Sequence, residues 1–336
     1  MSEKASKGVH LRQLLVSVLV VGLLATPVSS QRSAQESGTP EPTIRVDVSV
    51  VNVLCTVRDR KGGLAANLDK SDFDIREDGK PQQILYFSRE TKLPLTLGLL
   101  VDSSVSQERL IPEERRAAAA FLEQVLTPQD AAFLVSFDVT VDLLQDVTGS
   151  VDFLRAGLER IRVNSGGGAG SAGGPFPQIQ SGGTHLYDAV YLASDEVLRN
   201  EAGRKALILI TDGQDHGSKV TRDAAIEAAQ RADVILYSIL FFDRGFYGWG
   251  GAAYRGDSEL RKMSEETGGR VFEARNDREL NAAFEQISSE LRSQYSLGYS
   301  ATNAARDGSY RRIKVRTKQG GYRVQARKGY YAPMEN

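Results

Sequence analysis

The sequence is poor in the side chains that form disulfides and zinc sites. Its 336 residues include one cysteine, Cys55, and three histidines. A single cysteine excludes an internal disulfide, so the hydrophobic core must hold the fold together. Cys55 lies in a run of β-branched residues, which predicts a buried apolar side chain rather than a reactive thiol. The three histidines, one of them His10 near the N-terminus, give little basis for a zinc site of the His/Cys type.

The chain also lacks an excess of charge of either sign. Its 42 Lys and Arg balance 43 Asp and Glu, and 41% of its residues are hydrophobic. This composition excludes a wholly disordered chain, a collagen-like repeat and a protein with many membrane spans. The charge is uneven, because residues 95–294 hold 20 basic and 30 acidic side chains and residues 295–336 hold nine and two. The bases of the second stretch alternate with Ile313 and Val315, as on the solvated face of a hairpin, so we expect no nucleic-acid partner.

The N-terminus has the pattern of a signal peptide over residues 1–30. Basic residues precede an apolar core, Leu14–Ala25, and the small residues Val28–Ser30 suit cleavage before Gln31. The alternative is an uncleaved membrane anchor, but this core of 12 residues is shorter than the ~20 that span a bilayer. We therefore expect an exported protein that is periplasmic, secreted or at the cell surface, with membrane contact only if the leader is retained. Residues 31–43 are rich in Ser, Gln, Glu, Pro and Thr and predict a flexible linker.

The middle of the chain alternates short apolar runs with helical patterns. Such wholly apolar runs are typical of parallel strands that are covered on both faces. The fold class that this predicts is α/β, with a doubly wound, mostly parallel sheet between residues 93 and 294. Helices are expected to begin near Pro112, Val151, Leu186 and Asp277, and the four apolar runs are 95–101, 131–137, 206–211 and 234–240.

Both ends of the chain are rich in predicted strands. In the N-terminal segment, 44–92, the strands 73–77 and 83–87 are expected to form a hairpin through Asp78-Gly79. The C-terminal segment, 295–336, is expected to contain a β-hairpin with a turn at Gly320-Gly321. Because a small isolated sheet is marginally stable in water, the two segments can complete one small β-sandwich.

Polar side chains follow the predicted parallel strands where the strands end. The first strand runs into Asp102-x-Ser104-x-Ser106, Thr184 opens a helix, and Asp212 follows the strand 206–211. Binding sites of doubly wound sheets lie at this edge, so these side chains should converge there. Their hard oxygen atoms suit Mg²⁺. The alternative is that they are ordinary capping and turn residues.

Two other interpretations of polar motifs are weaker. The glycine-rich stretch 165–183 contains a match to a dinucleotide fingerprint, but no strand precedes it and no helix follows it as that motif requires. Ser104, Asp212 and His216 could suggest a hydrolase, but the chain has no Gly-x-Ser-x-Gly elbow. We therefore expect no enzyme activity, and His185 and His216 are expected to be loop or partner contacts.

The order Asp102-x-Ser104-x-Ser106, Thr184, Asp212 resembles the metal-ion-dependent adhesion site of von Willebrand factor type A (VWFA) domains. The stretch Leu68–Gln82 is similar to the lead-in of exported VWFA-related proteins of Acidobacteria. The resemblance implies that Ser104, Ser106 and Thr184 contact a divalent cation directly and that Asp102 and Asp212 act through water. The implied cation is Mg²⁺, with Mn²⁺ or Ca²⁺ as alternatives.

The resemblance also implies a function. One metal position would stay open for an Asp or Glu of a protein partner, so the chain would be an exported, adhesion-type binding module. The alternative is a structural scaffold of the same fold whose metal site is not functional.

Overall fold

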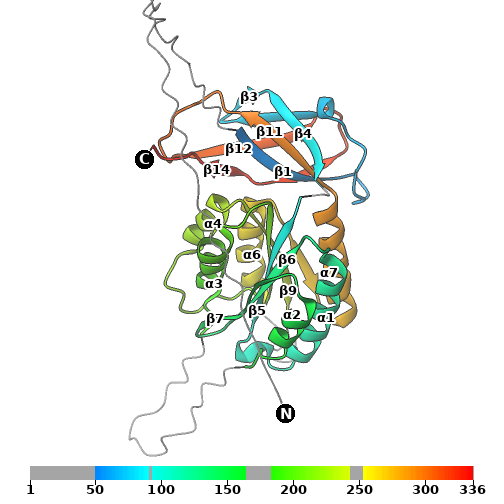
Figure 1. Ribbon diagram of the computed structural model, residues 1–336, viewed down its shortest axis with the longest axis vertical. Coiled ribbons are helices and arrows are strands. Elements are labelled where there is room, and N and C mark those ends of the chain that lie inside the picture. Colours follow the sequence, from blue (N-terminus) through cyan, green and yellow to red (C-terminus); the bar gives the residue numbers. More distant parts are fainter. Residues whose placement is uncertain (1–49, 91–92, 164–182, 243–252, 336) are drawn as a thin grey trace, which may run out of the picture. The chain divides into compact units, whose positions relative to one another are not determined.

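The structure is a computed structural model that describes residues 50–90, 93–163, 183–242 and 253–335 (Figure 1). The described residues all belong to one compact unit. The predicted leader, the linker and all but the last residue of the glycine-rich stretch lie outside the described residues. None of the helices in the described ranges is both long enough and apolar enough to cross a membrane.

A six-stranded sheet forms the centre of the α/β part. Its strand order is β10-β9-β8-β5-β6-β7, and every pairing is parallel except that of β7 with β6. Every residue of β5, β8 and β9 is buried, as the apolar runs predicted. The doubly wound, mostly parallel sheet is therefore confirmed. Its strands are β5 (Leu95–Asp102), β6 (Ala131–Phe137), β7 (Val141–Thr148), β8 (Arg204–Thr211), β9 (Val234–Phe241) and β10 (Val271–Ala274).

Helices cover the two faces of this sheet and form two separate cores (Figure 1). On one face, Phe121 and Phe284 stack with ring centroids 4.5 Å apart. On the other face, a Cβ at Gly98 would lie 2.3 Å from Phe133 and 2.4 Å from Leu207, so this position admits no side chain. The first face carries α1 (Ile111–Val125), α2 (Val151–Leu158) and α7 (Asp277–Arg292); the second carries α3 (Leu186–Leu192), α4 (Arg222–Arg231) and α6 (Ala253–Thr267).

The two ends of the chain form two further sheets that share a third core. One sheet has the order β13-β1-β11-β4 and the other β14-β12-β2-β3. In the first sheet the strands of the two ends alternate, and in the second two C-terminal strands lie beside two N-terminal strands, so neither end has a complete sheet of its own. The N-terminal strands are β1 (Val50–Arg58), β2 (Phe73–Glu77), β3 (Lys80–Gln82) and β4 (Ile84–Glu90); the C-terminal strands are β11 (Gln294–Ser300), β12 (Tyr310–Thr317), β13 (Arg323–Ala326) and β14 (Gly329–Tyr331).

The two hairpins differ from the sequence expectation. Asp78 and Gly79 do form a tight turn with positive φ angles of 47° and 82°, but it joins β2 to β3, whereas β4 pairs with β11 in the other sheet. The expected C-terminal hairpin is wrong, because β12 pairs with β2 and β14 while β13 pairs with β1. A strand alternation shows which side chains face a core, but it does not show which strand lies alongside.

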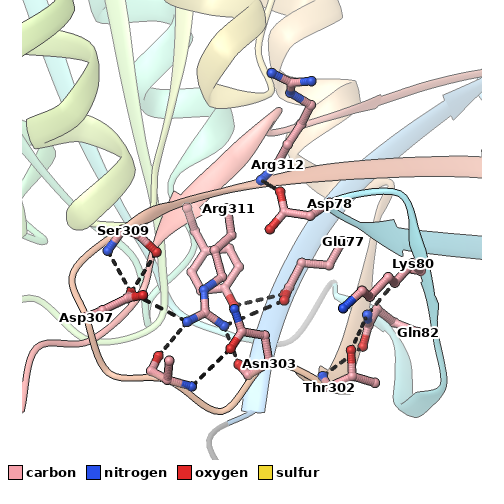
Figure 2. A network of polar contacts seen from close by, with 12 residues as sticks. Glu77, Asp78, Lys80, Gln82, Thr302, Asn303, Asp307, Ser309, Arg311 and Arg312 are labelled. Atoms are coloured by element: carbon pink, nitrogen blue, oxygen red, sulfur yellow. Dashed lines mark hydrogen bonds and ion pairs between the residues drawn. The ribbon is translucent and has the colours of Figure 1, made fainter.

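A buried ion pair joins the two ends of the chain inside this third core. Glu77 of β2 and Arg311 of β12 are each 2% exposed, and their side chains point toward one another at 3.7 Å (Figure 2). The hydroxyls of Tyr299 and Tyr330 donate hydrogen bonds of 2.7 and 2.9 Å to the second carboxylate oxygen of Glu77. Arg311 also donates to the carbonyl oxygen of Asn303. This network satisfies charges that would otherwise be costly to bury.

Candidate functional site

The candidate site lies where two neighbouring strands of the central sheet end. Asp102 is the last residue of β5, and Asp212 directly follows β8. β5 and β8 pair in parallel, and the chain order of the sheet reverses between them. The sequence therefore places both carboxylates at the switch point of a doubly wound sheet, where ligands of such folds bind.

Hydrogen bonds join four of the five predicted site residues. Asp102 accepts from the Ser104 backbone N–H at 2.9 Å, which fixes the first turn of the loop after β5. The hydroxyls of Ser104 and Ser106 lie 3.0 Å apart. Ser106 then donates to Asp212 Oδ2 at 2.8 Å, across to the loop that follows β8. The structure thus brings the Asp-x-Ser-x-Ser segment and Asp212 together as one connected polar group.

Thr184 reaches the same edge of the sheet through its backbone. It forms a two-way bridge with His216, with hydrogen bonds of 3.0 and 2.9 Å between their backbones. His216 lies four residues after Asp212, so Thr184 is attached to the loop that carries this carboxylate.

The side chains of the candidate site are more deeply buried than the position of their loops at the end of the sheet would lead one to expect. Asp102 is fully buried, Asp212 is 2% exposed, Thr184 6% and Ser104 9%, and Ser106 is half-buried. Side chains that are this deeply buried contribute to the stability of the fold as well as to any binding. Substitutions here are therefore expected to change stability along with binding.

The electrostatics of the site favour a bound cation. Burial, followed by the negative charge of Asp212, raises the pKa of Asp102 to about 7, although hydrogen bonds from Ser104 and Thr211 partly oppose this. Two buried carboxylates beside one another repel, and a positive ion between them would relieve both the repulsion and the lost hydration. Two carboxylates and three hydroxyls are also the oxygen donors that a hard cation prefers. The residues present therefore fit a divalent metal ion.

The two histidines near the site are not joined to its polar group. His216 Nε2 lies 2.9 Å from Gln214 Oε1, while the Ser104 hydroxyl pairs with Ser106, so the arrangement of a hydrolase triad is not formed. In the described part of the chain, no three His, Cys, Asp or Glu side chains are grouped so that they could hold a metal ion by themselves. Any cation here depends on the serine and threonine hydroxyls.

Sequence reasoning missed two features that support the site. Thr211 donates a 2.6 Å hydrogen bond to Asp102 Oδ2, and the only signal for this was its place at the end of an apolar strand. The first turns of α6 press on the loop after β8, since a Cβ at Gly256 would lie 2.1 Å from the carbonyl oxygen of Asp212. Gly213 opposite it has a φ of 80°, so both positions require glycine.

Comparison with known protein families identifies one that matches part of the chain. Residues 175–286 match the family model of the von Willebrand factor type A domain, a stretch that contains Thr184 and Asp212 and begins after Ser106. No curated protein matches the chain.

Solved structures give more distant similarities. The mussel byssus proximal thread matrix protein 1 with a zinc-occupied MIDAS motif is 15% identical, with a TM-score of 0.47 over 63% of this chain and 48% of that one. The vWF domain of the type V pilus tip protein Mfa5 from Porphyromonas gingivalis is 14% identical, with a TM-score of 0.44 over 59% of this chain and 94% of that one. A von Willebrand factor type A protein from Catenulispora acidiphila is 12% identical, with a TM-score of 0.44 over 87% of this chain and 76% of that one. The chain spans about half the length of the mussel protein chains that it matches.

Proposed function

We propose that this chain, whose residues 175–286 match the von Willebrand factor type A domain, is an exported, metal-dependent binding module of the adhesion type. One observation supports this more than any other. Asp102, Ser104, Ser106 and Asp212 form a connected polar group at the switch point between β5 and β8. The chemistry that we propose for this site is ligand capture.

The side chains divide into two roles in this proposal. The hydroxyls of Ser104, Ser106 and Thr184 contact the cation, and Asp102 and Asp212 hold its water ligands. A bound Mg²⁺, or Mn²⁺ or Ca²⁺ in its place, supplies a positive charge that attracts a carboxylate. Since hydroxyls are neutral ligands, they leave much of this charge available to an Asp or Glu of a protein partner. Thr211 holds Asp102 in place from the neighbouring strand.

Calorimetry with Mg²⁺ tests the metal site directly. We expect the wild type to bind one divalent cation, and Asp102→Ala and Thr184→Ala to lose this binding. Asp152→Ala is the matched control, because this aspartate of α2 has a side chain that is 89% exposed and lies outside the site. Circular dichroism of each variant shows whether the loss reflects binding or unfolding, which matters because Asp102 and Thr184 are buried.

Two outcomes would contradict the proposal. A wild type that binds no divalent cation at millimolar concentration would favour the alternative, a scaffold of the same fold with a non-functional metal site. Partner capture that survives EDTA would also refute a metal bridge. A pull-down from an extracytoplasmic extract, with and without EDTA, makes that comparison.

The export part of the proposal and the domain division rest on the sequence. Residues 1–30 would be removed, so intact-mass measurement of exported protein should show a mature N-terminus at Gln31. The proposed division places the metal-binding domain at 93–294, with the sandwich segments 44–92 and 295–336 on either side. A mass that retains residues 1–30 would indicate a membrane anchor instead.

A further inference from the structure

Glu114, on the first turns of α1, is a buried carboxylate without a visible partner. It is 1% exposed, and within the described residues neither of its carboxylate oxygens has a hydrogen-bond partner. Buried polar groups in folded proteins are nearly always hydrogen-bonded, and an isolated buried carboxylate is among the most costly exceptions. Such a group calls for a physical reason.

The backbone connects Glu114 directly to the loop of the candidate metal site. Leu110 N–H donates to the carbonyl oxygen of Gln107 at 2.8 Å, and Glu114 N–H donates to that of Leu110 at 3.0 Å. Successive bonds of this kind place Gln107 and Glu114 on one face of the turn and helix. Gln107 directly follows Ser106 and is fully buried.

Gln107, like Glu114, has a buried side-chain oxygen without a hydrogen-bond partner among the described residues. Its side-chain N–H group donates to the carbonyl oxygen of Phe241 at 3.2 Å, but its side-chain oxygen has no partner in the described part of the chain. Three buried acceptor oxygens, two from Glu114 and one from Gln107, therefore have no donor among the described residues. Acceptors without donors are typically served by ordered water or an ion.

The charges that shift the pKa of Glu114 most are all negative. Burial raises the pKa of Glu114 well above its usual range, and the negative charges of Asp102, Glu113 and Asp212 raise it further. The N-terminal end of α1 offers only a partial positive charge in compensation. A divalent cation held by the site hydroxyls would compensate Glu114 together with Asp102 and Asp212.

We propose that Glu114 is a third carboxylate of the metal site, which acts through ordered water from outside the ligand shell and whose buried charge is compensated only when a divalent cation is bound. This inference rests on the proposed metal-binding function. Direct ligation is not part of it, because no group of three carboxylate, His or Cys side chains in the described ranges is arranged as a ligand set. The residue is a positioning group that strengthens cation binding from behind the loop.

The test combines unfolding and binding measurements on the full chain. Glu114→Gln removes the charge and keeps the shape, and Glu114→Met replaces the carboxylate by an apolar group of similar size. In EDTA, at a pH above the raised pKa of Glu114, both variants should have a higher Tm than the wild type, since an uncompensated buried charge is gone. With Mg²⁺, both should show a smaller rise in Tm, and calorimetry should show about tenfold weaker Mg²⁺ binding, equal to about 1.4 kcal/mol.

Glu113→Gln is the matched control. It removes the same charge from the neighbouring position, but Glu113 is half-buried and interacts with Asp277 and Arg116 rather than with the site. We expect its Mg²⁺ affinity and its rise in Tm with Mg²⁺ to equal those of the wild type.

The outcomes separate this inference from the function on which it rests. If the wild type binds Mg²⁺ and both Glu114 variants bind it equally well, the inference is wrong and the proposed function stands. Variants that are less stable than the wild type in EDTA, or that fail to fold, would also overturn it, because they would show a carboxyl group that holds the fold together without metal. If the wild type does not respond to Mg²⁺ at all, the proposed function fails and this inference fails with it.

Discussion

Removing the charge of the buried Glu77 should destabilise the sandwich far more than removing a charge on its surface. Glu77→Gln keeps the shape of the side chain but removes the buried partner of the Arg311 guanidinium, which is 2% exposed and keeps only an ion pair of 3.6 Å with the exposed Asp307. Breaking a buried pair from one side costs about 3–5 kcal/mol. The hydroxyls of Tyr299 and Tyr330 would then donate to a neutral amide oxygen instead of a charged carboxylate. This weakens each of the two hydrogen bonds by roughly 1 kcal/mol.

Not all of these costs add, because they belong to one network, so we expect a loss of about 3 kcal/mol in the free energy of unfolding. Urea unfolding measures this loss, and hydrogen exchange locates it in β2, β11 and β12. The double variant Glu77→Gln/Arg311→Met should lose less than the sum of its single variants, because it leaves no buried charge unpaired.

A surface pair on the same strand provides the control. Asp74 and Arg76 of β2 lie 3.3 Å apart, with side chains 36% and 48% exposed, and solvent screens their attraction. Asp74→Asn should therefore change stability by less than about 0.5 kcal/mol. If Glu77→Gln cost no more than Asp74→Asn, the buried pair would not be stabilising the core and the reasoning would be refuted.

Three further predictions concern the chain ends, the thiol and the metal-free site. Truncation after Gln294 removes both partner strands of β1, so residues 50–90 should lose hydrogen-exchange protection while the α/β part keeps it; unchanged protection would exclude a shared sandwich. Burial raises the pKa of the Cys55 thiol far above its usual range, so Ellman's reagent should label Cys55 only as fast as the protein unfolds, and rapid labelling of the native state would contradict this. In EDTA, the raised pKa of Asp102, about 7 against 3.8, should favour the folded state below pH 3.8 and lose about 4 kcal/mol of stability as the pH rises through 7. Asp102→Asn should flatten this dependence, and an equal slope in both proteins would show that Asp102 is not its source.

Much of the α/β fold could be predicted because each of its buried strands is indicated by the short stretch of sequence that forms it. Apolar runs identified β5, β6, β8 and β9, since a strand buried on both faces has no polar side to confuse the pattern. Strand β7 was missed because it is an edge strand with a mixed burial pattern. The site segments could be predicted for a related reason, because the ends of parallel strands must meet at one edge of the sheet.

Strand partners and the surroundings of the site could not be predicted in the same way. β12 and β13 are close in sequence but lie in different sheets, a choice decided by burial against strands more than 200 residues away. Glu114 gave no signal, because acidic residues are common in the first turn of any helix and Glu113 beside it is of that ordinary kind. Only the folded chain distinguishes the buried carboxylate from the half-exposed one.

The shared sandwich also has a consequence for the timing of folding. Val50 of β1 pairs with Ser300 of β11, so the first strand to be synthesised waits for a partner about 250 residues later. At 5–20 residues per second, this delay is roughly 10–50 s, during which both edges of β1 lack their partners. The α/β part, whose strands and helices all lie between these two segments, is complete before the last strands are made. Folding therefore ends where synthesis began, and the newly made N-terminal strands need protection from pairing with other chains in the meantime.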